Sequence, residues 1–115
     1  GITVYVGYEP DLPTLGAMGS TGAISGLANV LPDTVRRMVK EHGSDGITRD
    51  AQTIARVLDI LQPYSLMPAL KSLMATVSGD AHWLRVRPPL VGMTPQAHAN
   101  LQAAWKALDL APATT

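Results

Sequence analysis

The fold is decided by a stretch close to the N-terminus, Ile2-Thr3-Val4-Tyr5-Val6-Gly7. It is mostly apolar, carries no charge and stops at a glycine, which is typical of a strand buried on both faces of a parallel sheet. A second short run, Ala23-Ile24-Ser25-Gly26, is also bounded by glycines and is too short to stand outside a larger sheet. Residues 12–18, between these runs, favour a short helix. The first part of the chain therefore predicts two strands joined by a helix.

The remainder of the chain has a helical pattern. Pro32 suits the first turn of a helix, and Thr94 followed by Pro95 is a typical helix start. We expect four helices, at about residues 32–42, 48–62, 65–77 and 95–110, followed by a loose tail at 111–115.

Two strands alone do not make a stable parallel sheet, because their edges and both faces need cover. A parallel sheet can also close into a barrel of alternating strands and helices, which takes roughly 250 residues. The chain has 115 residues and is too short for a complete barrel of this kind. It also begins at Gly1 inside an apolar run, without a methionine or a basic region before it. We therefore expect a cut or truncated chain whose missing strands come from elsewhere, although a glycine left by tag cleavage is the simpler alternative for Gly1.

Composition narrows the function classes. Nine basic and nine acidic residues give zero net charge, so neither nucleic acid nor an anionic membrane is an expected partner. There is no cysteine, which excludes disulfides and thiolate chemistry and favours a reducing, cytoplasmic location. The apolar runs are shorter than the roughly 20 residues of a membrane-spanning helix.

No motif predicts a cofactor. His42, His82 and His98 lie in three separate segments without ligand spacing, so no metal is expected. The glycines of Gly16-x-x-Gly19-x-x-Gly22 lack a nucleotide fingerprint. Their backbone amides could face a phosphate, but turn formation alone also explains them.

Three blocks carry a family resemblance: residues 4–9 (VYVGYE), residues 19–32 (GSTGAISGLANVLP), and Arg87-Pro88-Pro89-Leu90 before the last helix, preceded by Lys71-Ser72-Leu73-Met74. In order and spacing they resemble the C-terminal part of the dihydrodipicolinate synthase and N-acetylneuraminate lyase family of class I, Schiff-base aldolases. The resemblance covers nearly the whole chain. It implies an α/β fold: the seventh and eighth strands of a (β/α)8 TIM barrel, with the last two βα units in residues 1–42. Residues 43–115 would form a mainly helical C-terminal extension of the same larger domain.

The resemblance also implies where substrate binds. Active sites of such barrels lie at the C-terminal ends of the strands. Backbone groups at Gly7 and Ile24 would line the pocket for a 2-oxo acid, and a glycine allows close approach of the backbone. Tyr8 would line the mouth. Glu9 and Ser25-Gly26 match positions that in sugar-acid aldolases reach substrate hydroxyls, whereas Tyr5, inside the strand, is expected in the core.

The family's Schiff-base lysine lies on the sixth strand, which would precede Gly1. Lys40, Lys71 and Lys106 lie on amphipathic helices and are most simply solvated, so no catalytic residue is expected in this chain. The resemblance implies a lyase that is active only as the complete barrel, assembled as a homotetramer, with the isolated chain inactive. Its partners would be the rest of the barrel and a small 2-oxo acid.

Four reactions remain open under this resemblance. They are dihydrodipicolinate synthesis from pyruvate and aspartate semialdehyde, cleavage of a 2-keto-3-deoxy sugar acid, dehydration of such an acid, and sialic acid cleavage. Sialic acid lyases tend to carry an aspartate at the position of Glu9 and a serine at that of Gly26, so this chain departs from them twice. A non-catalytic helical interaction module is the alternative from another class.

Overall fold

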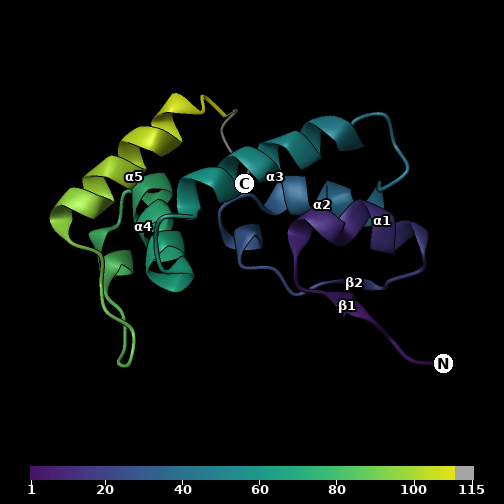
Figure 1. The fold of residues 1–115 in the computed structure, drawn as a ribbon, viewed down its shortest axis with the longest axis horizontal. Coiled ribbons are helices and arrows are strands. Elements are labelled where there is room, and N and C mark those ends of the chain that lie inside the picture. Colours follow the sequence, from purple (N-terminus) through teal and green to yellow (C-terminus); the bar gives the residue numbers. More distant parts are fainter. Residues whose placement is uncertain (111–115) are drawn as a thin grey trace. The chain divides into compact units, whose positions relative to one another are not determined.

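The computed structural model describes residues 1–110, which form two compact units, residues 1–55 and residues 56–110 (Figure 1). The boundary between the units falls inside helix α3 (Ile47–Leu61). The family resemblance predicts a different division, between residues 42 and 43, which would separate the last barrel units from the C-terminal extension. That division stays a prediction. The expected loose tail, residues 111–115, lies outside the described part of the chain.

The first unit holds a two-stranded parallel sheet and short helices. Strand β1 pairs with β2 so that Tyr5 lies opposite Gly22 and Val6 opposite Ala23. The elements of this unit are β1 (Tyr5–Val6), η1 (Glu9–Asp11), α1 (Leu12–Ala17), β2 (Gly22–Ala23), η2 (Leu27–Asn29), α2 (Pro32–Lys40) and the start of α3. The expected order of strand, helix, strand and helix is confirmed, although both strands are shorter than the sequence pattern predicts.

The core of the first unit lies between the sheet and its helices. Val6 is buried, and so are Leu12 of α1, Leu27 of η2 and Met38 of α2. Prolines in the first turns of α1 and α2 suit these helix starts, because a first-turn backbone N–H has no partner inside the helix. Helices α1 and α2 contact each other, and β2 contacts α1. One face of the short sheet is therefore covered by its own unit.

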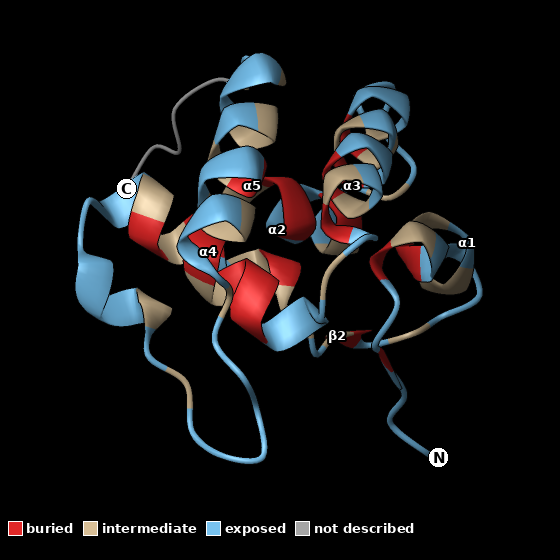
Figure 2. Ribbon diagram, turned by 60° about the vertical axis from the view of Figure 1, so that its left-hand side comes forward, coloured by how far each residue is buried: buried red, intermediate tan, exposed pale blue. Residues whose placement is uncertain are grey.

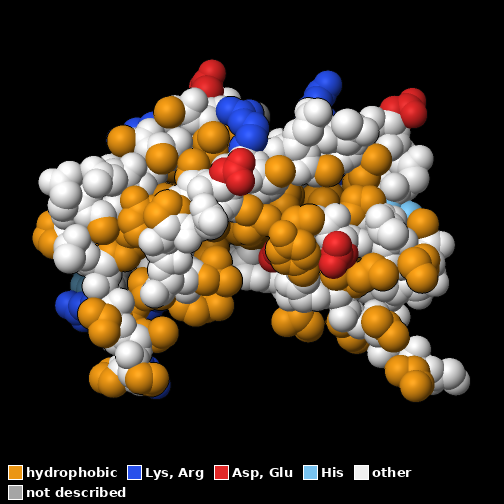
Figure 3. All heavy atoms as spheres, in the orientation of Figure 1, with side chains coloured by type: hydrophobic (Ala, Val, Ile, Leu, Met, Phe, Trp, Pro, Cys, Tyr) orange, Lys and Arg blue, Asp and Glu red, His pale blue; other side chains and the backbone are white. Residues whose placement is uncertain are grey.

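The other face of the sheet is open. Tyr5 is 55% exposed while its neighbour Val6 is buried, because successive side chains of a strand point to opposite faces. The expectation that Tyr5 lies in a core is thus wrong for the described residues. Among them, each strand has a single partner, which leaves one edge of β1 and one edge of β2 without a ladder. Apolar side chains gather along this N-terminal stretch (Figure 3), including the exposed Ile2 and Val4.

The second unit is helical. It contains the end of α3, then α4 (Leu66–Ser78), η3 (Ala81–Leu84) and α5 (Pro95–Ala107). Leu73 of α4 and Leu101 of α5 are fully buried where these helices pack, and the middle of α4 is mostly buried (Figure 2). Ser72, also fully buried, forms a 2.6 Å hydrogen bond with Nδ1 of His98 on α5.

Caps confirm the predicted start of α5 and the predicted end of α4 near residue 77, whereas α5 ends at Ala107, before the expected residue 110. The hydroxyl of Thr94 accepts a hydrogen bond from the Ala97 N–H at 3.1 Å, as expected for the residue before Pro95. Helix α4 ends at Gly79, whose φ of 74° is the left-handed conformation that favours glycine. The short helix η3 had no recognised signal in the sequence. No helix within residues 1–110 is long and apolar enough to cross a membrane.

Candidate functional site

The C-terminal ends of β1 and β2 lie side by side, because the two strands are parallel. The Thr21 N–H donates to the Val4 carbonyl at 2.8 Å, and the Ile24 N–H donates to the Val6 carbonyl at 3.0 Å. Gly7 follows Val6 directly. The structure thus brings together the two segments in which the sequence predicts substrate-binding residues.

Backbone and apolar groups at these strand ends are accessible. Tyr8 is 59% exposed and Ile24 is 74% exposed, and Gly7 is exposed as well. A Cβ atom built on Gly7 would have no neighbouring atom within 4 Å, so open space lies in front of its backbone. Gly26 is half-buried. The accessible surface at the strand ends is therefore mainly backbone, one aromatic ring and one aliphatic side chain.

Glu9 and Ser25 are also brought together, but they bind each other. Glu9 is only 7% exposed, and its Oε1 accepts a hydrogen bond from the Ser25 hydroxyl at 2.7 Å. The Leu27 N–H makes a longer contact of 3.5 Å with the same oxygen. The Ser25 hydroxyl in turn accepts from the Ala28 N–H at 3.1 Å. The sequence predicts both Glu9 and Ser25 as site residues. It does not predict the hydrogen bond between them, because they lie 16 positions apart in the chain.

The lysines of the described residues are not buried among apolar groups. Lys40 and Lys106 are exposed. The ammonium of Lys71 donates to the backbone carbonyl of Arg85. A lysine that forms a Schiff base near neutral pH needs an environment that favours its neutral amine. None of these three lysines is buried, since Lys71 is half-buried and the other two are exposed.

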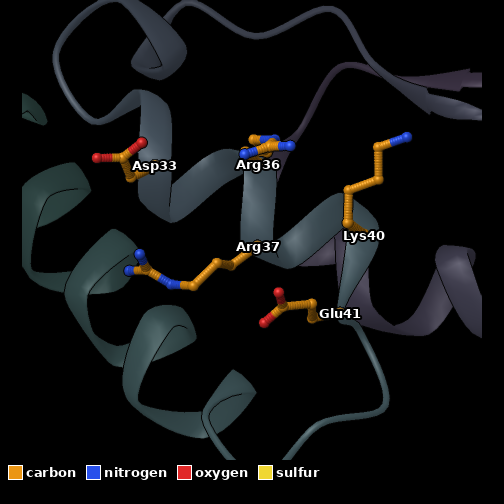
Figure 4. Close-up of a pocket in the computed structure, with 5 residues that line it drawn as sticks. All are labelled: Asp33, Arg36, Arg37, Lys40 and Glu41. Carbon is orange, nitrogen blue, oxygen red and sulfur yellow. The ribbon is translucent and has the colours of Figure 1, made fainter. Parts of the chain in front are cut away.

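A charged hollow of about 220 Å³ lies on α2, lined by Asp33, Arg36, Arg37, Lys40 and Glu41 (Figure 4). Arg37 forms a double hydrogen bond to Asp50, with Nε to Oδ2 at 2.9 Å and Nη2 to Oδ1 at 2.8 Å. The pKa of Arg37 is raised above its usual value, chiefly because its guanidinium donates to this carboxylate. Both signs of charge line the hollow, which is typical of a solvated helix face and provides no reactive group.

A second hollow of about 260 Å³ is more apolar. It lies between β2, the segment after it and α2, and its lining includes Ala23, Ala28, Val35 and Val39. Arg36 and Lys40 also contribute to its wall. No sequence pattern predicts this groove, because it depends on how α2 packs beside β2.

The histidines have separate structural contacts. Nδ1 of His82 lies 2.9 Å from Oδ1 of Asp80, and His98 contacts the buried Ser72. The ring of His42 lies so close to Gly16 that a Cβ there would come within 2.8 Å of it. Within residues 1–110, no three His, Cys, Asp or Glu side chains could hold a metal ion together.

The glycine pattern also has local structural causes. Gly19 has a φ of 97°, a conformation that side chains rarely adopt. A Cβ at Gly22 would lie 3.6 Å from the Tyr5 ring, which is ordinary contact.

Comparisons with known proteins point to one family. The model of the dihydrodipicolinate synthetase family matches residues 1–108. The crystal structure of dihydrodipicolinate synthase from Agrobacterium tumefaciens str. C58 is similar, with a TM-score of 0.80 and 32% sequence identity. The similarity covers 93% of this chain but 35% of that one, so the chain spans about a third of that protein's length. No curated protein matches the sequence.

Proposed function

The chain belongs to the dihydrodipicolinate synthetase family, and we propose that it forms the closing part of a barrel that acts as a 2-oxo acid-dependent lyase. In this proposal β1 and β2 are the seventh and eighth strands of a (β/α)8 barrel, and the later helices are its C-terminal extension. The observation that carries the proposal is the family match over residues 1–108, joined to a similarity that covers 35% of a dihydrodipicolinate synthase.

The open sheet supports this assignment. In a barrel each strand has neighbours on both sides, and one face points to the interior while the other packs against helices. Val6 is covered by the helices of its own unit, whereas Tyr5 on the opposite face is 55% exposed. In the complete barrel Tyr5 would point to the interior. The apolar groove beside β2 and α2 would receive the neighbouring strand and helix.

The proposed substrate site is the mouth at the C-terminal ends of the two strands. Gly7, Tyr8, Ile24 and Gly26 would line it, with Gly7 and Ile24 contributing backbone groups to the pocket of the 2-oxo acid. The open space in front of Gly7 supports this role. Glu9 and Ser25 adjoin this lining and bind each other.

The proposed chemistry uses a lysine outside residues 1–115. Its neutral amine would condense with the ketone of pyruvate or a related acid, with loss of water. The resulting iminium would accept the electron pair of an adjacent C–H or C–C bond as that bond breaks, and the enamine so formed would donate the pair when a carbon–carbon bond forms. This chain would shape the pocket and exclude water from it. Dihydrodipicolinate synthesis is the favoured reaction, because the similar solved structure carries that name. Cleavage or dehydration of a 2-keto-3-deoxy sugar acid is the second candidate, which the family resemblance leaves open. A cytoplasmic location and a homotetramer stay predictions.

Borohydride reduction in the presence of pyruvate tests the proposal. The complete protein that contains residues 1–115 is expected to gain a pyruvate adduct on one lysine outside this chain, detected by peptide mass spectrometry. Residues 1–115 alone are expected to form no adduct, and Lys40→Met in the complete protein is expected to leave adduct formation unchanged. No adduct in the complete protein, or an adduct on Lys40, Lys71 or Lys106, would contradict the proposal.

A further inference from the structure

We propose that Glu9 is a positioning residue: through Ser25 it fixes the turn after β2, and thereby the backbone of Ile24, without touching substrate. This inference rests on the proposed function for its catalytic consequence. It differs from the role that the family resemblance implies, in which Glu9 and Ser25-Gly26 reach hydroxyls of the substrate.

The first argument is the burial of Glu9. Its side chain leaves the chain immediately after the exposed Tyr8, yet only 7% of the residue is accessible. Within residues 1–110 no cation lies within ion-pair distance of its carboxylate. A buried carboxylate needs hydrogen-bond donors to offset the loss of hydration. Here the donors come from the segment after β2, so the burial of Glu9 is tied to the conformation of that segment.

The second argument is the geometry of the Glu9–Ser25 bond. At 2.7 Å, the distance between the Ser25 hydroxyl and Oε1 is that of a well-formed O–H···O hydrogen bond. The Ser25 hydroxyl has a single proton, and this bond uses it. The Ala28 N–H occupies an acceptor site of the same hydroxyl. Ser25 is thus left without a donor for a substrate hydroxyl.

The third argument is where the backbone pairing stops. The last ladder bond between the strand ends runs from the Ile24 N–H to the Val6 carbonyl. Beyond it, the Glu9–Ser25 bond continues the connection between the two strand ends by side chains. On the far side, the side-chain amide of Asn29 donates to the Gly26 carbonyl at 3.0 Å. Ile24 is therefore held by the ladder bond at its own N–H and by the contacts of Ser25 and Gly26 that follow it, and removal of Glu9 takes away the contact of Ser25.

Double-mutant kinetics in the complete protein test this role. We expect Glu9→Ala and Ser25→Ala each to raise the KM for pyruvate about tenfold, the effect of losing one hydrogen bond to a charged group. The double variant is expected to be no worse than either single variant, because both remove the same connection. Glu9→Gln keeps an acceptor oxygen, and Ser25→Thr keeps the hydroxyl, so both are expected to stay within about threefold of the unchanged protein.

A substrate-binding role would give a different pattern. Glu9→Gln would then weaken binding of a hydroxylated second substrate while the KM for pyruvate stayed unchanged, and the effects of Glu9→Ala and Ser25→Ala would add. Either result would overturn the positioning role.

The failure of this inference can be told apart from failure of the proposed function. Amide hydrogen exchange of the complete protein without substrate reports on the turn without any catalysis. We expect Glu9→Ala to speed exchange of the Ala28 amide about tenfold, and Glu9→Gln to leave it near the unchanged rate. If the borohydride experiment fails but this exchange result holds, the aldolase proposal is wrong and the turn-fixing role of Glu9 stands. Equal exchange rates of the Ala28 amide in the unchanged protein and in the Glu9→Ala and Glu9→Gln variants would contradict that role.

Discussion

The two units of this chain differ in what their backbones leave unsatisfied. Residues 1–55 hold a sheet with an open edge on each strand, whereas the helices of residues 56–110 satisfy most of their hydrogen-bonding groups internally. Both units expose apolar side chains, such as Ile24 in the first and Val91 in the second. Only in the first do they accompany open strand edges, which need another strand. The difference supports the proposal that further chain completes the sheet of the first unit, while the second is stabilised largely by its own packing.

The largest effect is expected from a charge on the open face of β1. Tyr5→Asp should change the free energy of unfolding of residues 1–115 by less than about 0.5 kcal/mol, because the side chain is exposed there. In the complete protein the same carboxylate would enter the barrel interior, at a cost of several kcal/mol. We expect that protein to lose its folded state in circular dichroism and urea unfolding.

Tyr5→Phe is the matched control, since it keeps the ring and adds no charge. It is expected to be tolerated in both contexts. If Tyr5→Asp is tolerated in the complete protein, this face of β1 does not enter a packed interior.

A smaller effect, equal in both contexts, is expected in the second unit. Leu73 is fully buried within the helical packing of α4, so Leu73→Ala should cost about 2–5 kcal/mol of unfolding free energy. Urea unfolding followed by the fluorescence of Trp83 and Trp105, which lie in the same unit, measures this cost. Val77→Ala on the 47%-exposed position of the same helix should cost under about 1 kcal/mol. A loss that appears only in the complete protein would show that the second unit is not self-sufficient.

Within the first unit, the ion pair between α2 and α3 should contribute less. Asp50→Asn removes the charge that receives two hydrogen bonds from Arg37, and we expect a cost of about 1–2 kcal/mol. This expected cost is small because the Arg37 side chain is 47% exposed, so that water screens the attraction between the two charges. Asp45→Asn, at an exposed position of the preceding loop, is the control. In a double-mutant cycle with Arg37→Met, fully additive costs would mean that the pair contributes nothing.

The smallest effect is a pH response in the second unit. The pKa of Asp80 is lowered, first by the hydrogen bond from the His82 backbone and then by the His82 side chain. A lowered folded-state pKa stabilises the structure above the unfolded value of about 3.9, and this contribution disappears as the pH falls through the lower folded value. In NMR spectra, the chemical shift of the His82 amide should therefore change with pH at values below those at which ordinary carboxyl groups titrate. Asp80→Asn should abolish this shift, and a transition at or above the ordinary value would contradict the assignment.

Much of this architecture could be predicted from local sequence. The helix starts at Pro32 and Thr94 follow from the backbone chemistry of one or two residues. The position of Tyr5 could not, because burial of a strand face depends on which other strands are present. The site shows the same limit. Glu9 and Ser25 were recognisable as residues at strand ends, but their bond depends on the parallel register that places two distant segments together.

Amide hydrogen exchange of the strands tests the central claim most directly. The measurement compares the exchange rates of the amides of residues 4–6 and 22–24 between the chain of residues 1–115 alone and the complete protein that contains it. The open edges predict exchange at least about a hundredfold faster in the chain alone, while the amides of α4 should differ far less. Equal protection of the strand amides in both proteins would contradict the account, because the two strands would then need no neighbours.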